Sequence, residues 1–146
     1  MYTAKETGVN QMSHFPTLKS VELLTVEAFQ SYLNTLLWST SDDDGDSYGD
    51  YIEPSDLDES EIETQWYQCY GFIKSNSEAI FCLLEEGYNL ERIMHDFCLT
   101  RNRHGAGFWD GDYPEPYATQ LTESAQKYAE ISLYTGDDDR VYIFCG

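Results

Sequence analysis

The stretch TVEAFQSYLNTLLW, residues 25–38, decides how the rest of the chain is interpreted. Thr25 is a suitable N-cap, and Glu27 lies in the first turn, where a carboxylate interacts favourably with the helix dipole. Apolar side chains then recur at helical spacing: Phe29, Tyr32, Leu33, Leu36 and Leu37. The pattern predicts an amphipathic helix over residues 26–38, with one face directed at a core.

A second helix is predicted to begin near Ser60, because Ser60 and Glu63 have the spacing of a capping box. Apolar side chains continue one face of this helix well beyond its start, and Gly87 is a suitable C-terminal stop. Gly71 and the cluster at residues 75–77 are places where the helix could bend or split.

The C-terminal half predicts two more helices and a hairpin. Asn89 is a suitable cap for a third helix, which ends before a loop rich in Gly, Pro and aromatic residues. A fourth helix is expected over residues 117–130. The β-prone runs at residues 131–135 and 140–145 flank a turn at residues 136–139 and predict a hairpin.

These patterns predict an α+β fold that is mainly helical, with about four helices and a small C-terminal antiparallel β-hairpin. Residues 1–20 are expected to form a flexible N-terminal arm, and residues 21–146 a single acidic globular domain. The aromatic content of 15% supports a folded chain, since disordered acidic segments are poor in aromatic residues.

The charge of the chain points to the kind of partner it binds. Its 146 residues include 27 acidic and only 8 basic side chains, a formal net charge of −19. Solubility asks for a net charge of only about 2 to 8, and a larger charge weakens the compact state by self-repulsion. Halophilic adaptation, metal binding and attraction to a basic partner are three explanations of the surplus. Direct binding to nucleic acid or to an anionic membrane is disfavoured on charge alone.

The most acidic stretch, residues 42–63, contains 11 carboxylates and neither Lys nor Arg. These are the predicted partner-binding residues: Asp42, Asp43, Asp44, Asp46, Asp50, Glu53, Asp56, Asp58, Glu59, Glu61 and Glu63. Neither folding nor solubility requires such a potential, and it would steer a basic groove onto the chain. Tyr48, Tyr51 and Trp66, interleaved with the acids, are the expected aromatic anchors.

The first half of this stretch also matches the ligand positions of an EF-hand calcium loop. With Asp42 at position 1, acidic side chains follow at positions 3, 5, 9 and 12, the last being Glu53. Ser47 takes the place of the glycine that allows the sharp turn, and Gly49 stands where an apolar residue is usual. Calcium binding is therefore expected to be weak or absent, and no metal or other cofactor is assigned.

Candidate catalytic groups lack a motif that would give them a role. His95–Asp96, and His104 with Asp110 or Asp112, have the composition of a general base with an orienting carboxylate. No nucleophile elbow, zinc-binding helix or phosphate loop accompanies them. No catalytic residue is assigned, and the chain is not expected to be an enzyme.

The cysteines and the hydropathy pattern favour a reducing compartment. The four cysteines have no CxxC spacing, and Cys69 and Cys98 sit among apolar residues, as small core side chains do. The polar residues 1–10 do not resemble a signal peptide, and no apolar run approaches the roughly 18 residues of a membrane span. Free thiols and a cytoplasmic location are therefore expected.

The segment at residues 99–113 combines Arg101, Arg103 and His104 with glycines and aromatic residues. At the C-terminal end of a helix, basic side chains stabilise the helix dipole. Phe108 and Trp109 are expected to be mostly buried in the core. A partner contact and an active site are the less favoured interpretations of this loop.

Three segments of the chain resemble a family of small acidic proteins from tailed bacteriophages. They are LTVEAFQSYLNTLLWSTSDDD at residues 24–44, HDFCLTRNRHGAGFWDGDY at residues 95–113 and AEISLYTGDDDRVYIF at residues 129–144. The likeness covers most of the chain from Leu24 and is most specific at residues 99–110, although Cys98 replaces a usual Trp and Arg103 a usual Gly. The resemblance implies a phage origin and expression inside a bacterium, and it implies no activity.

The leading hypothesis is a phage-encoded acidic binding protein of the host cytoplasm, a DNA mimic that inhibits a basic host DNA-binding or defence protein. A helix rises about 1.5 Å per residue, so carboxylates two or three residues apart approximate the phosphate spacing of about 3.4 Å along one DNA strand. The alternative is a divalent-metal-binding or structural accessory phage protein without inhibitory activity. The sequence leaves the target and the oligomeric state open.

Overall fold

The computed structural model describes residues 24–145, and the expected arm at residues 1–20 lies outside this range. The elements follow in the order α2 (Val26–Ser39), the 3₁₀ turns η3 (Tyr48–Asp50) and η4 (Pro54–Asp56), α3 (Glu59–Ser75), α4 (Ser77–Glu85), α5 (Leu90–Arg101), α6 (Tyr117–Ala125), β1 (Ile131–Thr135) and β2 (Val141–Cys145). The α+β class is confirmed, because the described chain is mainly helical and ends in a two-stranded antiparallel sheet.

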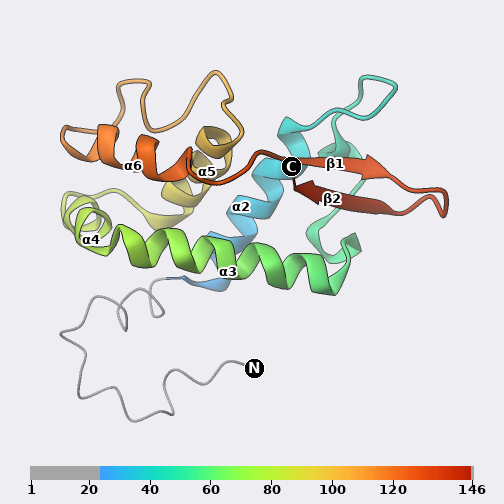
Figure 1. Cartoon of the computed structure of the whole chain (residues 1–146), viewed down its shortest axis with the longest axis horizontal. Helices are drawn as coiled ribbons and strands as arrows, with labels where there is room; N and C mark the ends of the chain where they lie inside the picture. The colour runs from blue at the N-terminus through green and yellow to red at the C-terminus, as the bar shows by residue number, and fades with distance from the viewer. Residues whose placement is uncertain (1–23, 146) are drawn as a thin grey trace, which may run out of the picture.

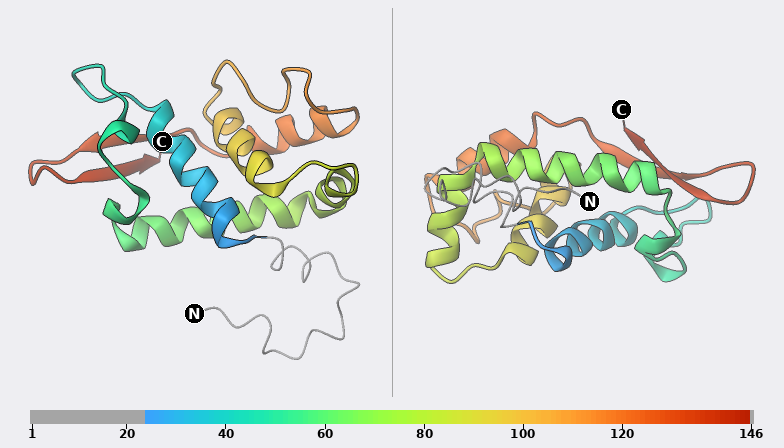
Figure 2. Two further views of the ribbon diagram at one scale, coloured as in Figure 1. Left: turned by 180° about the vertical axis from the view of Figure 1, so that it is seen from behind. Right: turned by 90° about the horizontal axis from the view of Figure 1, so that it is seen from below.

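The helices form two layers around one core. Figure 1 shows α3 running along one side of the molecule, with α4 at one end of it and the β1–β2 hairpin at the other. Seen from below in Figure 2, α3, α6 and the hairpin lie in one layer, and α2 and α5 lie in the other. The packing of α2 along α5 is the most extensive helix–helix contact between described elements.

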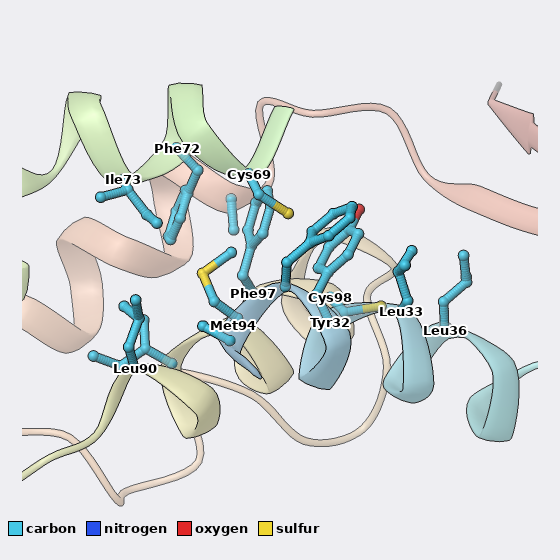
Figure 3. Close-up of a cluster of buried hydrophobic side chains, with 14 of the residues drawn as sticks. Tyr32, Leu33, Leu36, Cys69, Phe72, Ile73, Leu90, Met94, Phe97 and Cys98 are labelled. Carbon is cyan, nitrogen blue, oxygen red and sulfur yellow. The ribbon is translucent and has the colours of Figure 1, made fainter. Parts of the chain in front are cut away.

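Aromatic side chains join the two layers. The ring of Phe97 on α5 stacks on Phe72 of α3 at a centroid distance of 4.0 Å and on Tyr32 of α2 at 5.6 Å. Phe108, from the loop after α5, stacks on the other side of Phe72 at 5.9 Å. Figure 3 shows Cys69, Phe72 and Ile73 pointing from α3 toward the side chains of α2 and α5. These rings are fully buried, so each removes roughly 150–250 Å² of largely apolar surface from water.

Several helix ends agree with the sequence. The side chain of Thr25 accepts a hydrogen bond from the Ala28 N–H, and that of Asn89 accepts one from the Arg92 N–H, as expected of N-caps. Gly87 follows α4 with a φ of +104°, the left-handed conformation that lets glycine end a helix.

The second predicted helix differs from the structure at its start, and it splits at one of the two places that the sequence predicted. Its N-cap is Asp58, whose carboxylate accepts hydrogen bonds from the N–H groups of Ser60 and Glu61, so the predicted start at Ser60 is wrong. The helix splits at the buried Asn76, whose side-chain amide donates to the Phe72 carbonyl and to the Ser124 hydroxyl. An amide that competes for backbone groups explains why the chain is redirected there.

Gly71 lies within α3 and does not interrupt it. A Cβ at this position would come within 3.3 Å of the Tyr128 hydroxyl, so the glycine allows the chain after α6 to approach α3 closely. The fourth predicted helix was expected to reach Glu130, but α6 ends at Ala125. The chain turns there, and the Ala129 carbonyl then accepts two hydrogen bonds from Arg101.

The hairpin agrees with the prediction to within one residue. Its register pairs Ile131 with Cys145 and Thr135 with Val141. The strands alternate in burial as a half-buried sheet does, with Ile131, Leu133, Val141 and Ile143 facing the core. The hairpin is fastened to the helices, because the Ile143 N–H donates to the Glu61 carboxylate at 2.9 Å.

The thiols expected in the core are there. Cys69 and Cys98 are fully buried and free of disulfides, and burial raises the pKa of the Cys98 thiol to about 12. A thiol with so high a pKa stays protonated and unreactive at neutral pH. Among residues 24–145, no helix has the length and apolar character that crossing a membrane requires.

Candidate partner-binding surface

The predicted acidic residues gather at one end of the molecule. In Figure 1 the loop after α2, the turns η3 and η4 and the start of α3 all lie on the right, beside the hairpin. The view from behind in Figure 2 shows the same grouping at the opposite edge of the picture. The helices α4 and α6 lie at the other end. We call the end formed by residues 42–63 and the hairpin turn at residues 136–140 the acidic end.

Asp42 organises the loop that follows α2. Its Oδ1 accepts hydrogen bonds from the N–H groups of Asp44 and Asp46, each at 2.9 Å, and its Oδ2 accepts one from the Tyr51 hydroxyl at 2.7 Å. The hydrogen bond from Tyr51 lowers the pKa of Asp42, and the same bond raises the pKa of Tyr51 to about 12. Asp42 therefore shapes the loop and has little capacity left for a ligand.

Four further carboxylates of the stretch also serve the fold. Glu53 and Asp56 bond reciprocally to each other's backbone N–H around η4. Asp58 caps α3, and its hydrogen bond with the Ser60 hydroxyl lowers the pKa of the Asp58 carboxyl. Glu61 holds β2 through Ile143. These contacts account for acidic side chains whose charge alone predicted a binding role.

The other predicted residues are exposed, and their carboxylates make no hydrogen bond or ion pair with residues 24–145. They are Asp43, Asp44, Asp46 and Asp50 on the loop and Glu59 and Glu63 on α3. Their charges face solvent without compensation from the described part of the chain. We call them the uncommitted carboxylates.

The hairpin turn adds acids that sequence reasoning did not assign to the surface. Asp137, Asp138 and Asp139 are exposed at the tip between β1 and β2, which lies at the acidic end (Figure 1). Asp138 accepts hydrogen bonds from the Arg140 N–H and the Tyr142 hydroxyl, and the latter lowers its pKa. The run of three aspartates was visible in the sequence, but only the structure shows that it lies near residues 42–63.

The calcium-loop spacing does not produce a cluster of ligands. Asp42 and Glu53, at the first and last ligand positions, are both engaged by backbone N–H groups. Across residues 24–145, no group of three or more His, Cys, Asp or Glu side chains is placed to hold a metal ion. The expectation of weak or absent calcium binding stays a prediction.

The aromatic anchors expected beside the acids differ in exposure. Tyr51 is 53% exposed and available for contact, but Tyr48 is buried beneath the loop with its hydroxyl 3.4 Å from Thr135. Tyr48 was therefore wrongly predicted as an anchor. Tyr134, whose ring stacks on Tyr142 at 5.6 Å, is an exposed aromatic of the hairpin that the sequence did not single out.

The segment at residues 99–113 builds the core. The Phe108 N–H donates to the Thr100 hydroxyl at 3.1 Å, and a Cβ on Gly107 would come within 2.3 Å of that hydroxyl oxygen. Glycine is therefore required for the loop to close against α5. Phe108 is buried as predicted, but Trp109 is 53% exposed, so its predicted burial is wrong. The neighbouring side chains of Phe108 and Trp109 point in different directions, and of these two only Phe108 reaches the core.

Arg101 lies in the interior and does not merely face the end of α5. Its guanidinium donates to the Ala129 carbonyl, to the Tyr32 hydroxyl at 3.0 Å and to the Gln68 side chain at 2.6 Å. It also lies over the ring of Tyr128, 5.2 Å from the centroid. The expectation that Arg101 mainly stabilises the helix dipole is thus too simple, because it joins α2, α3 and the chain after α6.

The His95–Asp96 pair exists and is tied to the fold. His95 Nδ1 lies 3.0 Å from the carboxylate of Asp96, whose other oxygen accepts a hydrogen bond from the Tyr113 hydroxyl at 2.6 Å. Burial, with this hydrogen bond, raises the pKa of Tyr113. The His95 ring stacks on Trp38 at 5.9 Å, and His104 meets the same indole edge-on. Among the described residues, no nucleophilic side chain is hydrogen-bonded to His95. The His95–Asp96 pair therefore has no nucleophile that it could activate within the described part of the chain.

The fold and this surface define an acidic, mainly helical α+β protein with uncommitted carboxylates at one end. Comparisons with family models, with curated proteins and with solved structures found no match to the chain.

Proposed function

We propose that the chain is a phage-encoded acidic binding protein whose acidic end occupies the nucleic-acid-binding groove of a basic host DNA-binding or defence protein. It acts as a DNA mimic in the host cytoplasm and inhibits the protein it binds. The observation that carries this proposal is that the uncommitted carboxylates of a loop and a helix gather at one end together with the exposed aspartates of the hairpin turn. Mimicry requires carboxylates that are grouped, and scattered ones would not serve it.

The charge pattern fits a basic groove for a physical reason. Arg140 is the one cationic side chain within the segments that form the acidic end, so their negative potential is little compensated locally. Such a potential accelerates association with a basic surface and opposes binding to nucleic acid itself. Tyr51 and Tyr134, both about half exposed, provide aromatic contact area among the acids, as interface hot spots commonly do.

The alternative is a divalent-metal-binding or structural accessory role for the same loop. The engagement of Asp42 and Glu53 within the fold does not favour it. Nor does the His95–Asp96 pair favour an enzyme, because its carboxylate is occupied by Tyr113.

The test begins with capture of partners from a bacterial lysate on the tagged full chain, followed by competition with duplex DNA. The structure permits substitutions that spare the carboxylates needed for folding. One variant changes Asp43, Asp44, Asp46 and Asp50 to Asn, and a second changes Glu59 and Glu63 to Gln. A matched control changes Glu78, Glu85 and Glu86, which are exposed on or beside α4 at the opposite end, to Gln.

We expect each acidic-end variant to bind the captured partner about tenfold more weakly or worse, and the α4 control to bind normally. Binding of the unchanged chain should weaken steeply with salt, because exposed charges are screened beyond about 8 Å at physiological ionic strength. A partner that binds no nucleic acid, or full affinity in both acidic-end variants, would contradict the proposal.

A further inference from the structure

A shallow groove runs between the start of α2, the turn η4 and the first half of α3. It consists of two adjoining depressions of ≈ 580 Å³ and ≈ 260 Å³, which share Phe29, Ile62 and Trp66 as lining residues. Val26 extends the groove at the N-terminal end of α2, and Tyr67 extends it along α3. Val26 is 71% exposed and Tyr67 56% exposed, so apolar surface remains accessible here.

The groove has an apolar floor and an acidic rim. The ring of Trp66 meets Tyr67 edge-on at 5.5 Å, and both side chains line the larger depression. Glu59 and Glu63 lie along the same side, and no cation of residues 24–145 pairs with either of them. An occupant of matching chemistry carries apolar side chains next to a positive charge.

We infer that this groove binds the chain's own N-terminal segment, residues 12–20, with Phe15 and Leu18 on the apolar floor and Lys19 beside Glu59 and Glu63. The segment reads MSHFPTLKS and combines those two apolar side chains with one of the chain's 8 basic residues. The inference does not rest on the proposed function.

The course of the chain places this segment within reach. Leu24 is buried, and Val26, two residues later, already lines the groove, so the described part of the chain begins at the groove's edge. An extended chain covers about 3.3–3.6 Å per residue, so Leu18 reaches about 20 Å from Leu24. In the sequence Phe15 precedes a proline, and a residue in that position favours an extended conformation, which suits a segment that lies along a groove.

A tethered segment also has an advantage over a separate molecule. A short linker gives the segment an effective concentration in the millimolar range, so a modest apolar contact suffices for docking. A second copy of the chain would bring another formal charge of −19 toward the acidic rim and be repelled. The expectation of a loose arm then holds only for the residues before the docking segment.

The experiment uses Trp66 as a reporter in the full chain. Trp38→Phe and Trp109→Phe remove the other two indoles, both of which are about half exposed, and leave Trp66 as the single fluorophore. Quenching by acrylamide, a neutral molecule that the protein's charge does not repel, reports the accessibility of Trp66. The measurement compares this protein with Phe15→Ser/Leu18→Ser, with Lys19→Glu, and with Val9→Ser as the matched control outside the docking segment.

We expect the quenching constant to rise about twofold in the Phe15→Ser/Leu18→Ser protein, to rise less in Lys19→Glu, and to stay unchanged in Val9→Ser. Circular dichroism should show the same helix content in all of them, since none of the three changes touches the described core. Protection of Trp66 should not depend on protein concentration. Unchanged quenching in the Phe15→Ser/Leu18→Ser protein would overturn the inference, and so would protection that grows with concentration, which would identify a second copy as the occupant.

Discussion

At the scale of single residues, Arg101 is the side chain that joins α2, α3 and the chain after α6. It is fully buried, and its guanidinium is satisfied by a carbonyl, a hydroxyl and an amide oxygen. None of the carboxylates in residues 24–145 bonds to it, which is unusual in a chain with so many acids. A cation held by neutral acceptors and aromatic faces is tolerated inside a protein when it is hydrogen-bonded, and each of the three guanidinium nitrogens of Arg101 donates at least one hydrogen bond.

Arg101→Ala should lower the free energy of unfolding by about 3 kcal/mol or more, because it leaves a cavity and buried acceptors without donors. Arg103→Ala is the matched control. Arg103 is exposed, its contact with Glu130 is a long 3.9 Å, and its loss should change stability by no more than about 0.5 kcal/mol. Urea unfolding of both variants checks the contrast, and similar losses would contradict the structural role of Arg101.

Neighbouring aromatic residues in the loop after α5 should respond very differently to truncation. Phe108→Ala removes a fully buried ring that stacks on Phe72, which typically lowers stability by about 3–5 kcal/mol. Trp109→Ala removes a half-exposed side chain and should lower it by less than about 1 kcal/mol. Thermal melting of the two variants provides the comparison, and a greater loss for Trp109→Ala would show that the loop packs differently.

At the scale of elements, the sequence predicted the features that depend on neighbouring residues better than those that depend on contacts far along the chain. The start of α2, the cap of α5 and the hairpin turn were predictable, because caps and turns depend on residues close in sequence. The break at Asn76 was predicted only as one of two places, because one of the two hydrogen bonds of the Asn76 amide goes to Ser124, far along the chain. The early end of α6 depends likewise on Arg101, a partner that periodicity does not reveal.

The loop after α2 should show its internal hydrogen bond in a titration. The pKa of Tyr51 is raised to about 12 by its bond to Asp42, so the tyrosine prefers to stay protonated in the folded state. Its contribution to stability is present below the unfolded pKa of about 10 and is lost as the pH rises through about 12. Asp42→Asn should bring the pKa of Tyr51 back toward 10, as measured by NMR of labelled tyrosine.

At low pH the same bond makes stability depend on pH in the opposite direction. Because the pKa of Asp42 is lowered, its contribution is complete above the unfolded value of about 3.9 and is lost as the pH falls through the folded value. Tyr51→Phe should therefore raise the pKa of Asp42. An unchanged Tyr51 titration in Asp42→Asn would show that the two side chains do not interact.

Calcium binding by residues 42–53 should be weak or absent. Ser47 replaces the turn glycine, and Asp42 and Glu53 are engaged by backbone N–H groups that a metal ion would have to displace. Calorimetric titration with calcium checks this, with Glu53→Gln as the paired variant. A tight site that Glu53→Gln abolishes would contradict the prediction and favour the metal-binding alternative.

At the scale of the whole molecule, the distribution of charge was only partly predictable. The sequence identified residues 42–63 but not the contribution of Asp137–Asp139, because the hairpin reaches the acidic end through contacts such as Glu61 with Ile143. Charge alone also does not distinguish a helix cap such as Asp58 from an uncommitted carboxylate, and the binding role of these residues stays a prediction.

Self-repulsion among these charges should make stability depend on salt. Between about 0.01 M and 1 M sodium chloride the Debye length falls from about 30 Å to about 3 Å, which screens the repulsion. We expect calorimetry to show a melting temperature that rises by about 3 °C or more, equivalent to about 1 kcal/mol for a chain of this size. The rise should be smaller in the variant with Asp43, Asp44, Asp46 and Asp50 changed to Asn. A flat response in the unchanged protein would show that its charges are compensated in the folded state.

We expect the grouping of carboxylates at the acidic end to give the molecule an electric dipole moment. Lys74 lies in the last turn of α3 and Lys127 follows the end of α6, so both of these cations are remote from the acidic end. In the field of a basic surface, such a molecule experiences a torque before any contact is made. It turns its hairpin end forward, so orientation precedes collision, and dielectric relaxation in dilute solution would measure the moment directly.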